Sequence, residues 1–450
     1  MDSRASFFLK ISGLFFVGSI ILLVLGMFTA LPYRVGLLAL ACAAAFAVTG
    51  YKGCRGYTYT AWVMVCVGGG FSFPQFLMEW HSFPLPLLIV PLTQLCMFGM
   101  GATLSLDDFR RILVSPWPIF IGAMLQFTVM PFVGFLVVMM FGFEGELAAG
   151  IILIGSVSGG LASNVMCFIA KANVALSVTM TVVSTFAAPL MTPLLMQLLA
   201  GQFVQIDPFM MLIGVLNITI VPVVAGLIAH SILYSRKWLF NGVYGLLIMI
   251  AAGVAVSLFF CCGCLPEMLL LFRTSVLLGT VAVTVIAFFK LILNVWLHKS
   301  EAWMERVLPL ISMVSICFVL AIITAQTHDV LIQAGIMILL AAVIHNAVGY
   351  AFGYWLGRGA GSLFGKIGYK LKLCKTPASI IDETDCRTIA FEVGMQNGGM
   401  ATGLAMDVLR SHVAALPPNV FGTWMNISGS ILANWWKGKP IKGQSDSADK

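Results

Sequence analysis

The sequence Glu392-Val393-Gly394-Met395-Gln396-Asn397-Gly398-Gly399 places one carboxylate, two amides and a glycine pair within an otherwise apolar stretch. If that stretch crosses a membrane, the carboxylate is costly there and is a candidate functional group. Adjacent glycines inside a helix are also unfavourable unless the backbone has to open at that point. The segment therefore predicts a broken membrane helix with polar groups gathered at the break.

The apolar character of this stretch extends over the whole chain. Of its 450 residues, 60% are apolar and only 10% are charged, and the mean hydropathy is +1.01. So few charges do not keep the surface of a soluble domain hydrated, and the lipid bilayer is therefore the expected solvent. Apolar runs of about 20 residues recur, each long enough to span the hydrocarbon layer as a helix. The composition predicts an all-α polytopic membrane protein.

Hydropathy, interrupted at proline, glycine and charge clusters, predicts about 14 transmembrane helices. The first set is expected near residues 7–29, 34–50, 59–80, 85–104, 117–141, 147–170 and 174–200. The second set is expected near residues 207–235, 239–260, 267–297, 307–325, 331–357, 388–409 and 413–436. A basic loop is expected from Arg358 to Arg387, ahead of the thirteenth helix.

The distribution of basic residues predicts the orientation in the membrane. With a cytoplasmic N-terminus, the 25 Lys and Arg residues all fall on cytoplasmic segments except Arg34, Arg273 and Arg410. Cytoplasmic loops are enriched in Lys and Arg, so both termini are expected to be cytoplasmic, in the cell (inner) membrane. The net charge of +7 then follows from topology, and no nucleic-acid partner is expected.

A second glycine pair suggests an internal repeat. The motif Gly159-Gly160-Leu161-Ala162-Ser163 matches Gly398-Gly399-Met400-Ala401-Thr402 in residue type, and each lies in the sixth helix of its set of seven. A repeat with an odd number of helices inserts the second time in inverted orientation, as in many secondary carriers. Residues 1–200 and 207–437 are therefore expected to form two inverted repeats. The alternative is that the glycines only allow close helix packing.

Further polar side chains accompany these breaks. They are Ser156, Ser158, Ser163 and Asn164 at the first break, the one-faced stripe Ser177, Thr181, Ser184 and Thr185 on the next helix, and Gln126 and Asn426 elsewhere. One carboxylate and several neutral oxygens suit a small hard cation such as sodium. Alternatively, Glu392 reaches the surface or pairs with Arg387, and the hydroxyls bond to their own helix backbone. His345 and Asn346 either line the pathway or form a packed pair.

At these residues the sequence resembles the bile acid:sodium symporter family, including its bacterial members. The resemblance runs from Pro84 to Trp435, apart from an insertion at 236–300. It is carried by Gly159–Asn164, Asn173–Thr181 and Glu392–Asn397, with Gln126-Phe127 and Met130-Pro131 upstream.

The resemblance implies a core bundle that moves against a panel. The core would comprise residues 117–200 and 331–436, in which broken helices at 147–170 and 388–409 cross, and the panel would comprise the remainder. Compared with typical members, this chain adds a hairpin at 1–58 and another at 236–300. These hairpins are expected to enlarge the panel or an oligomer contact, and a homo-oligomer is left open.

The resemblance also implies two sodium sites and a substrate site. Sodium site 1 would comprise Ser163, Asn164, Ser177, Thr181 and Glu392. Sodium site 2 would comprise Gln126, Glu392, Val393, Met395 and Gln396. The substrate would lie near Leu161, Asn397 and Asn426, against the crossover glycines Gly159, Gly160, Gly398 and Gly399. Leu161 and Met425 stand where some relatives have polar residues, a departure that concerns the identity of the substrate.

The expected function is sodium-coupled symport of a small organic anion by alternating access. Bile-acid-like, pantoate-like and other carboxylate or sulfonate substrates remain open, and membrane lipid is the other expected partner. The alternative is a proton-coupled carrier of the same fold in which Glu392 titrates. An enzyme is not expected, because the sequence has no metal-ligand spacing, paired intramembrane aspartates or Ser-His arrangement.

Overall fold

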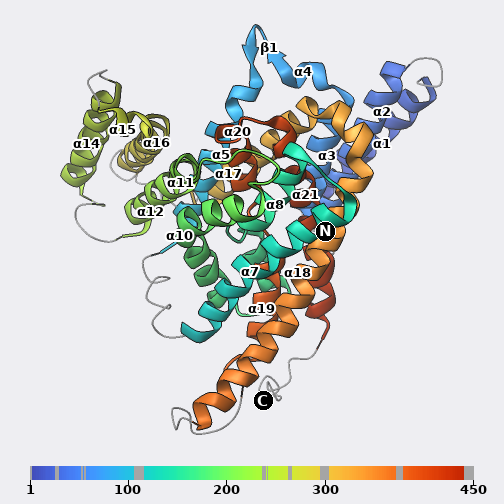
Figure 1. Ribbon diagram of the computed structural model, residues 1–450. Coiled ribbons are helices and arrows are strands. Elements are labelled where there is room, and N and C mark those ends of the chain that lie inside the picture. Colours follow the sequence, from blue (N-terminus) through green and yellow to red (C-terminus); the bar gives the residue numbers. More distant parts are fainter. Residues whose placement is uncertain are drawn as a thin grey trace, which may run out of the picture.

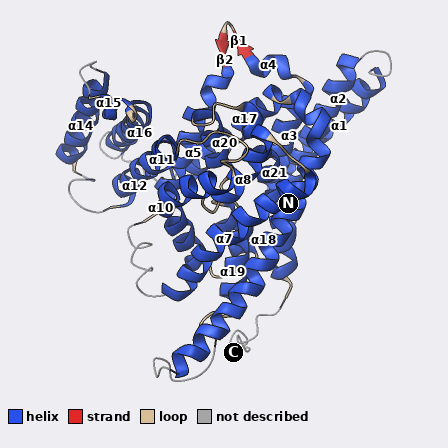
Figure 2. Ribbon diagram, in the orientation of Figure 1, coloured by secondary structure: helices blue, strands red, loops and turns tan. Residues whose placement is uncertain are grey.

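The structure of the protein is a computed structural model. It describes residues 3–25, 30–51, 54, 57–105, 116–235, 240, 242–261, 266–293, 304–370 and 379–439. Nearly all of them are helical, as Figure 2 shows. Within these ranges, eight helices are long and apolar enough to cross a membrane, and four further apolar helices are shorter. The protein is therefore a helical membrane protein, whereas the count of 14 spans stays a prediction.

The N-terminal part forms a peripheral hairpin followed by helices that lead toward the centre. Its elements are α1 (Ser3–Leu25), α2 (Ala30–Gly50), α3 (Thr58–Ser72), α4 (Pro74–Met78), β1 (Glu79–Trp80), β2 (Phe83–Pro84), the 3-10 helix η2 (Leu85–Leu88) and α5 (Ile89–Thr103). Helices α1 and α2 pack on each other, and α2 also contacts α3. In Figure 1 this hairpin lies at one edge of the molecule.

The single helix expected at 59–80 is wrong. Helix α3 ends at Ser72, and Pro74 starts the short helix α4 because proline is tolerated in a first turn but not in a helix interior. Strands β1 and β2 then pair, and the two residues of their turn, His81 and Ser82, have φ values of 48° and 64°. Positive φ at both turn residues is what a tight hairpin requires, and the fold is therefore not purely α-helical.

Four helices that follow in the sequence contribute to the centre of the molecule. They are α7 (Pro116–Phe141), α8 (Gly145–Ser156), α9 (Ala162–Ile169) and α10 (Val174–Leu199). They are followed by α11 (Pro208–Val215), a π-helical turn η3 (Leu216–Ile220) and α12 (Val221–Tyr234). Asn173 begins α10 as an N-cap, its side chain accepting a hydrogen bond from Leu176 N at 3.0 Å. This cap ends the loop after α9 and orients the hydroxyl stripe of α10.

A second hairpin lies at the opposite edge of the molecule in Figure 1. It comprises α14 (Val243–Cys261), α15 (Glu267–Leu270) and α16 (Arg273–Leu291). Within the insertion at 236–300, residues 236–239, 241, 262–265 and 294–300 lie outside the described part. Helix α16 packs on α12 and α5, and the buried Lys290 donates from Nζ to the carbonyl oxygens of Ile232 and Leu233 at the end of α12. A cation at a helix C-terminus is favourable, and here it fastens the hairpin to α12.

The remaining helices are α17 (Met304–Gln326), α18 (His328–Lys370), α19 (Glu383–Gly394), α20 (Gly398–Asp407) and α21 (His412–Lys437). The basic loop expected from Arg358 to Arg387 is wrong over much of its length, because α18 continues to Lys370 and α19 begins at Glu383. Polarity alone does not end a helix, and no proline occurs between Arg358 and Lys370. Residues 371–378 lie outside the described part.

The largest buried apolar cluster joins α7, α8, α10, α18, α19, α20 and α21. Small residues bring these backbones close together, as between α8 and α21, where a Cβ on Gly150 would lie 2.3 Å from Ala414 O. Membrane helices use such small-residue contacts for close packing. The cluster surrounds the place where α8 and α9, and α19 and α20, are interrupted.

Candidate functional site

The two interrupted helices cross and satisfy each other's open backbone. Gly160 N donates to Met395 O at 2.8 Å, and Asn397 N donates to Ser158 O at 2.9 Å. Gly159 and Gln396 form an isolated antiparallel bridge between these hydrogen bonds. Irregular backbone at membrane depth is tolerated where such partners exist. The crossing therefore holds the two breaks together and brings residues far apart in sequence into contact.

The glycines of the first break are required by this close approach. A Cβ on Gly160 would lie 2.7 Å from Gln396 O, and one on Gly159 would lie 2.9 Å from Glu392 Oε2. The second pair is less crowded. A Cβ would come within 3.2 Å of Pro418 O at Gly398 and within 3.0 Å of Ile316 Cδ1 at Gly399. The glycines of the first pair thus allow the other broken helix to approach closely. Gly398 and Gly399 are the first two residues of α20.

Glu392 is buried beside this crossing, with 2% of its surface exposed. Its Oε1 accepts hydrogen bonds from Ser163 Oγ and, at 2.5 Å, from Ser177 Oγ, and its Oε2 accepts one from Thr181 Oγ1 at 2.9 Å. Asn164 Oδ1 lies 2.7 Å from Ser177 Oγ. The structure thus brings together all five residues of the expected first sodium site, from α9, α10 and α19.

The close oxygen–oxygen contacts in this cluster outnumber the hydroxyl protons available to form hydrogen bonds. Each of the three hydroxyls faces two acceptors: Ser163 faces Gly160 O and Glu392, Ser177 faces Asn164 Oδ1 and Glu392, and Thr181 faces Ser177 O and Glu392. A hydroxyl carries one proton, so some of these oxygen–oxygen contacts lack one. Converging oxygens around a single carboxylate are the ligands that a small hard cation prefers.

A pair of amides, Gln126 and Gln396, adjoins the crossing. Gln126 Nε2 donates to Gln396 Oε1 at 2.5 Å and to Val157 O at 3.1 Å. Gln396 Nε2 donates to Val393 O at 2.6 Å. Three members of the expected second sodium site, Gln126, Val393 and Gln396, are therefore adjacent.

Glu392 and Met395 of the expected second site, and two serines of the first break, have other partners in this structure. Met395 O is occupied by Gly160 N, and within the described residues no hydrogen bond joins the Glu392 carboxylate to Gln126 or Gln396. Ser156 bonds to Ile152 O in its own helix, and Ser158 contacts Met400 Sδ. The second site is therefore less complete in this conformation than the first.

The structure decides against two alternative roles. Arg387 pairs with Glu383, its Nε lying 3.2 Å from Glu383 Oε1, and not with Glu392. His345 and Asn346 are packed inside, where His345 Nε2 lies 3.1 Å from Met130 O and Asn346 Nδ2 donates to Gly394 O. His345 and Asn346 thus support α7 and α19 and do not line the cavity described next.

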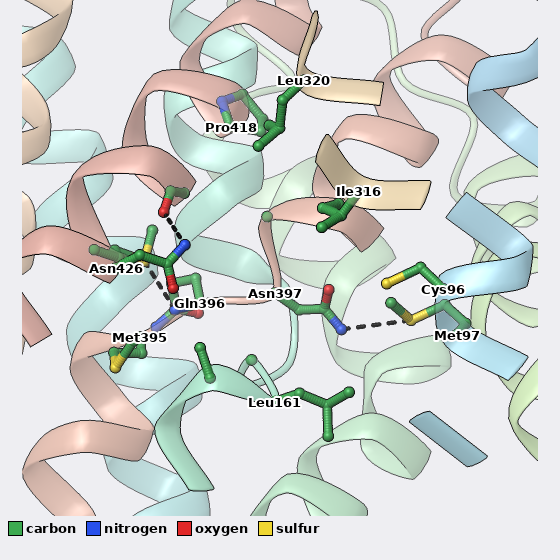
Figure 3. A pocket seen from close by; sticks show the side chains of 16 residues that line it. Cys96, Met97, Leu161, Ile316, Leu320, Met395, Gln396, Asn397, Pro418 and Asn426 are labelled. Atoms are coloured by element: carbon green, nitrogen blue, oxygen red, sulfur yellow. Dashed lines mark hydrogen bonds between the residues drawn. The ribbon is translucent and has the colours of Figure 1, made fainter. Parts of the chain in front are cut away.

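A cavity of about 110 Å³ adjoins the crossing. Figure 3 shows it between α5, α17, α21 and both breaks. It is lined by Cys96, Met97, Gly160, Leu161, Ala162, Ile316, Leu320, Met395, Gln396, Asn397, Gly398, Gly399, Pro418, Gly422, Met425 and Asn426. No Lys or Arg is among these residues, so an anion here would depend on backbone N–H groups at the starts of α9 and α20.

All three residues expected at the substrate site line this cavity. Asn397 caps α20 through Met400 N at 3.0 Å and points its Nδ2 toward Met97 Sδ, as Figure 3 shows. Asn426 Nδ2 donates to Gly422 O, whereas its buried Oδ1 has no hydrogen-bond partner in the described part of the chain. Asn426 therefore offers an acceptor beside the cavity.

Several contributing residues were not anticipated from the sequence. Cys96 and Met97 on α5 and Ile316 and Leu320 on α17 supply the wall opposite the crossing, and as ordinary apolar helix residues they carry no sequence signal. Ser184 accepts a hydrogen bond from Gly159 N at 3.3 Å. Unlike the wall residues, Ser184 was expected at the site, since it belongs to the hydroxyl stripe predicted from the sequence.

Comparison with known proteins now places the chain. The family model described as Sodium Bile acid symporter family matches residues 90–265. The uncharacterized sodium-dependent transporter YocS of Bacillus subtilis (strain 168) is 31% identical over 392 residues, covering 87% of this chain and 94% of that protein. The chain belongs to the bile acid:sodium symporter family. The resemblance read from the motifs is thereby confirmed.

Other relatives of this family member come from plants. The probable chloroplastic sodium/metabolite cotransporter BASS1 is 30% identical in Arabidopsis thaliana, over 80% of this chain and 68% of that protein. The rice protein of the same name is 28% identical, over 80% and 70%. These relatives are transporters, not enzymes. Among solved structures, the sodium proton antiporter MjNhaP1 from Methanocaldococcus jannaschii superposes with a TM-score of 0.43 and 14% identity, over 92% of this chain and 99% of that one. So weak a likeness carries no functional argument.

Proposed function

We propose that the protein is a sodium-coupled symporter of a small organic anion that works by alternating access. The observation that carries the proposal is the Glu392 cluster, in which hydroxyl oxygens from α9 and α10 converge on one carboxylate of α19 and the amide oxygen of Asn164 lies beside the Ser177 hydroxyl. A cation bound there would link the two broken helices. Sodium in the names of the relatives favours sodium over protons as the coupling ion.

Coupling between sodium and the anion would follow from the closeness of the Glu392 cluster to the cavity. The segment after Glu392 continues through Met395 and Asn397 into the wall of the cavity. An ion that fixes this segment would raise the affinity for the anion, and the anion would raise the affinity for sodium by the same factor. The anion would bind near Leu161, Asn397 and Asn426.

The wider arrangement is part of the same proposal. Helices of residues 117–200 and 331–436 would form the core, and the remainder a panel, within two inverted repeats with cytoplasmic termini. Two sodium ions would bind, the second at Gln126 and Gln396. The cavity supports this division, because one of its walls comes from α5 and α17, which would belong to the panel, and the opposite wall comes from the two breaks, which would belong to the core.

Sodium is expected to raise the melting temperature of the purified protein, and an equal concentration of potassium is not. A ligand that binds only the folded state stabilises it according to its concentration and affinity. A panel of carboxylates and sulfonates, tested with and without sodium, should contain anions whose stabilisation requires sodium. A melting temperature that responds to pH and ignores sodium would instead assign proton coupling.

Replacing Thr181 by valine is expected to weaken sodium stabilisation. Valine keeps the shape but removes one oxygen from the Glu392 cluster. A hydrogen bond to a charged group contributes about 1.5–3 kcal/mol, so the sodium concentration for half-maximal stabilisation should rise about tenfold or more. The matched control is Thr179→Val on the same helix, since within the described residues the Thr179 hydroxyl bonds only to Ala175 O, at 2.8 Å. Equal sodium responses in the two variants would contradict the assignment.

A further inference from the structure

A second cavity, of about 690 Å³, lies away from the crossing, where α18, α19 and α21 meet near the C-terminal end of α21. Its lining is basic and aromatic as well as acidic. It comprises Tyr354, Arg358, Ser362, Ser379, Ile381, Asp382, Glu383, Cys386, Arg387, Trp435, Trp436 and Lys439. None of these residues belongs to the sodium or anion sites proposed above.

The acidic groups of this cavity are already engaged by the protein. Glu383 accepts hydrogen bonds from Tyr354 Oη, from Arg358 Nη1 at 3.1 Å and from Arg387 Nε at 3.2 Å. Asp382 caps α19 and accepts from Asp385 N at 2.8 Å. Glu383 is thus ion-paired with both arginines, whereas Asp382 is held by hydrogen bonds within the fold and keeps its charge.

Positive charge remains available at the mouth of the cavity. The side chain of Arg358 is 53% exposed. Within the described residues, its guanidinium donates hydrogen bonds only from Nη1. Lys439 Nζ lies 5.1 Å from the centre of the Trp435 ring, and within the described residues no salt bridge joins it to a carboxylate. Lys439 therefore presents an unpaired cation to an anionic ligand, and Arg358 presents the free edge of a guanidinium that is also paired with Glu383.

Exposed aromatic side chains flank the same end of the helices. Trp355, which follows the lining residue Tyr354, is 64% exposed, and Trp435 is 56% exposed. Exposed Trp and Tyr gather at the headgroup level of membranes, and basic pockets between membrane helices bind anionic lipid headgroups. Ile431 and Leu363, exposed on α21 and α18, offer apolar surface for acyl chains beside the cavity.

We propose that this cavity binds the phosphodiester headgroup of an anionic phospholipid, with Arg358 and Lys439 contacting the phosphate. A free phosphorylated solute shares the phosphate chemistry. The flanking aromatic and apolar side chains favour the lipid, because a soluble phosphate has no use for them.

The test measures the melting temperature of the full-length protein in a neutral detergent during titration with lipid. Phosphatidylglycerol should raise it, and phosphatidylcholine at the same concentration should not. Removing one basic residue near the membrane weakens anionic-lipid binding about fivefold. Lys439→Gln should therefore shift the phosphatidylglycerol titration about fivefold, and the double variant with Arg358→Gln should shift it further.

The matched control is Lys366→Gln, a basic residue on α18 that does not line the cavity. It should shift the titration less than Lys439→Gln does, because Lys366 adds to the general surface charge without contacting the headgroup. An equal response to phosphatidylcholine, or an unchanged titration in Lys439→Gln, would overturn the proposal. Stabilisation by inorganic phosphate or glycerol phosphate without lipid would overturn the lipid assignment. Within the described residues the Lys439 side chain contacts the Trp435 ring, and the hydrogen bond of Lys439 to Trp436 O leaves from the backbone, so this variant tests binding without loss of folding.

Discussion

Replacing Glu392 by glutamine is expected to abolish sodium-driven uptake into proteoliposomes. Glutamine preserves the size of the side chain but removes the one carboxylate on which Ser163, Ser177 and Thr181 converge. Its amide also supplies protons to a cluster whose oxygens would otherwise face a cation. Removing one partner of a buried charge interaction costs at least about 3 kcal/mol, so sodium affinity should fall roughly a hundredfold or more.

The readouts for this variant are uptake under a sodium gradient and the sodium dependence of the melting temperature. Glu79→Gln is the control, because Glu79 lies on the exposed hairpin strand β1. It should retain both properties. Near-normal sodium-driven uptake by Glu392→Gln would refute the role proposed for this carboxylate.

Replacing Gly160 by alanine is expected to impair uptake strongly, because the added methyl group would lie at the crossing itself. The new Cβ would lie 2.7 Å from Gln396 O, a backbone atom that cannot move aside without disturbing the crossing. Overpacking of this kind costs about 1–3 kcal/mol of stability. Because both the Glu392 cluster and the cavity depend on the crossing, uptake should fall at least roughly tenfold.

Gly68→Ala provides the matched comparison, since a Cβ at Gly68 in α3 meets no atom within 4 Å. Its uptake should equal that of the wild type. The melting temperature in saturating sodium separates a destabilised protein from a folded one with a displaced crossing. Wild-type uptake by Gly160→Ala would show that the crossing tolerates displacement and would contradict its proposed role.

Much of the site could be anticipated because its chemistry is local in sequence. A carboxylate and paired glycines are energetically unfavourable inside an apolar helix. The glycine pairs therefore indicated both breaks from the sequence alone, and Glu392 marked the second. The stripe containing Ser177 and Thr181 followed from helical periodicity. Periodicity also explains why both hydroxyls face the same neighbour, Glu392, in the structure.

The remainder depended on contacts that no local pattern encodes. Which break would supply backbone donors to the other, for example Gly160 N to Met395 O, is decided by how the helices pack. The apolar wall from Met97 and Ile316 is likewise a matter of packing. The extension of α18 to Lys370 escaped prediction because hydropathy marks where a helix leaves the apolar layer, not where it ends.

The mutual hydrogen bonding of the two breaks has a consequence for biogenesis. Ser163 and Glu392 are 229 residues apart, so the first break enters the membrane long before its partner has been synthesised. Until then Ser158 O and Gly160 N lack the partners that they have in the finished protein. Contacts of such sequence separation form late and slowly. Until Asn397 has been synthesised, the open backbone of the first break therefore needs other hydrogen-bond partners, such as water.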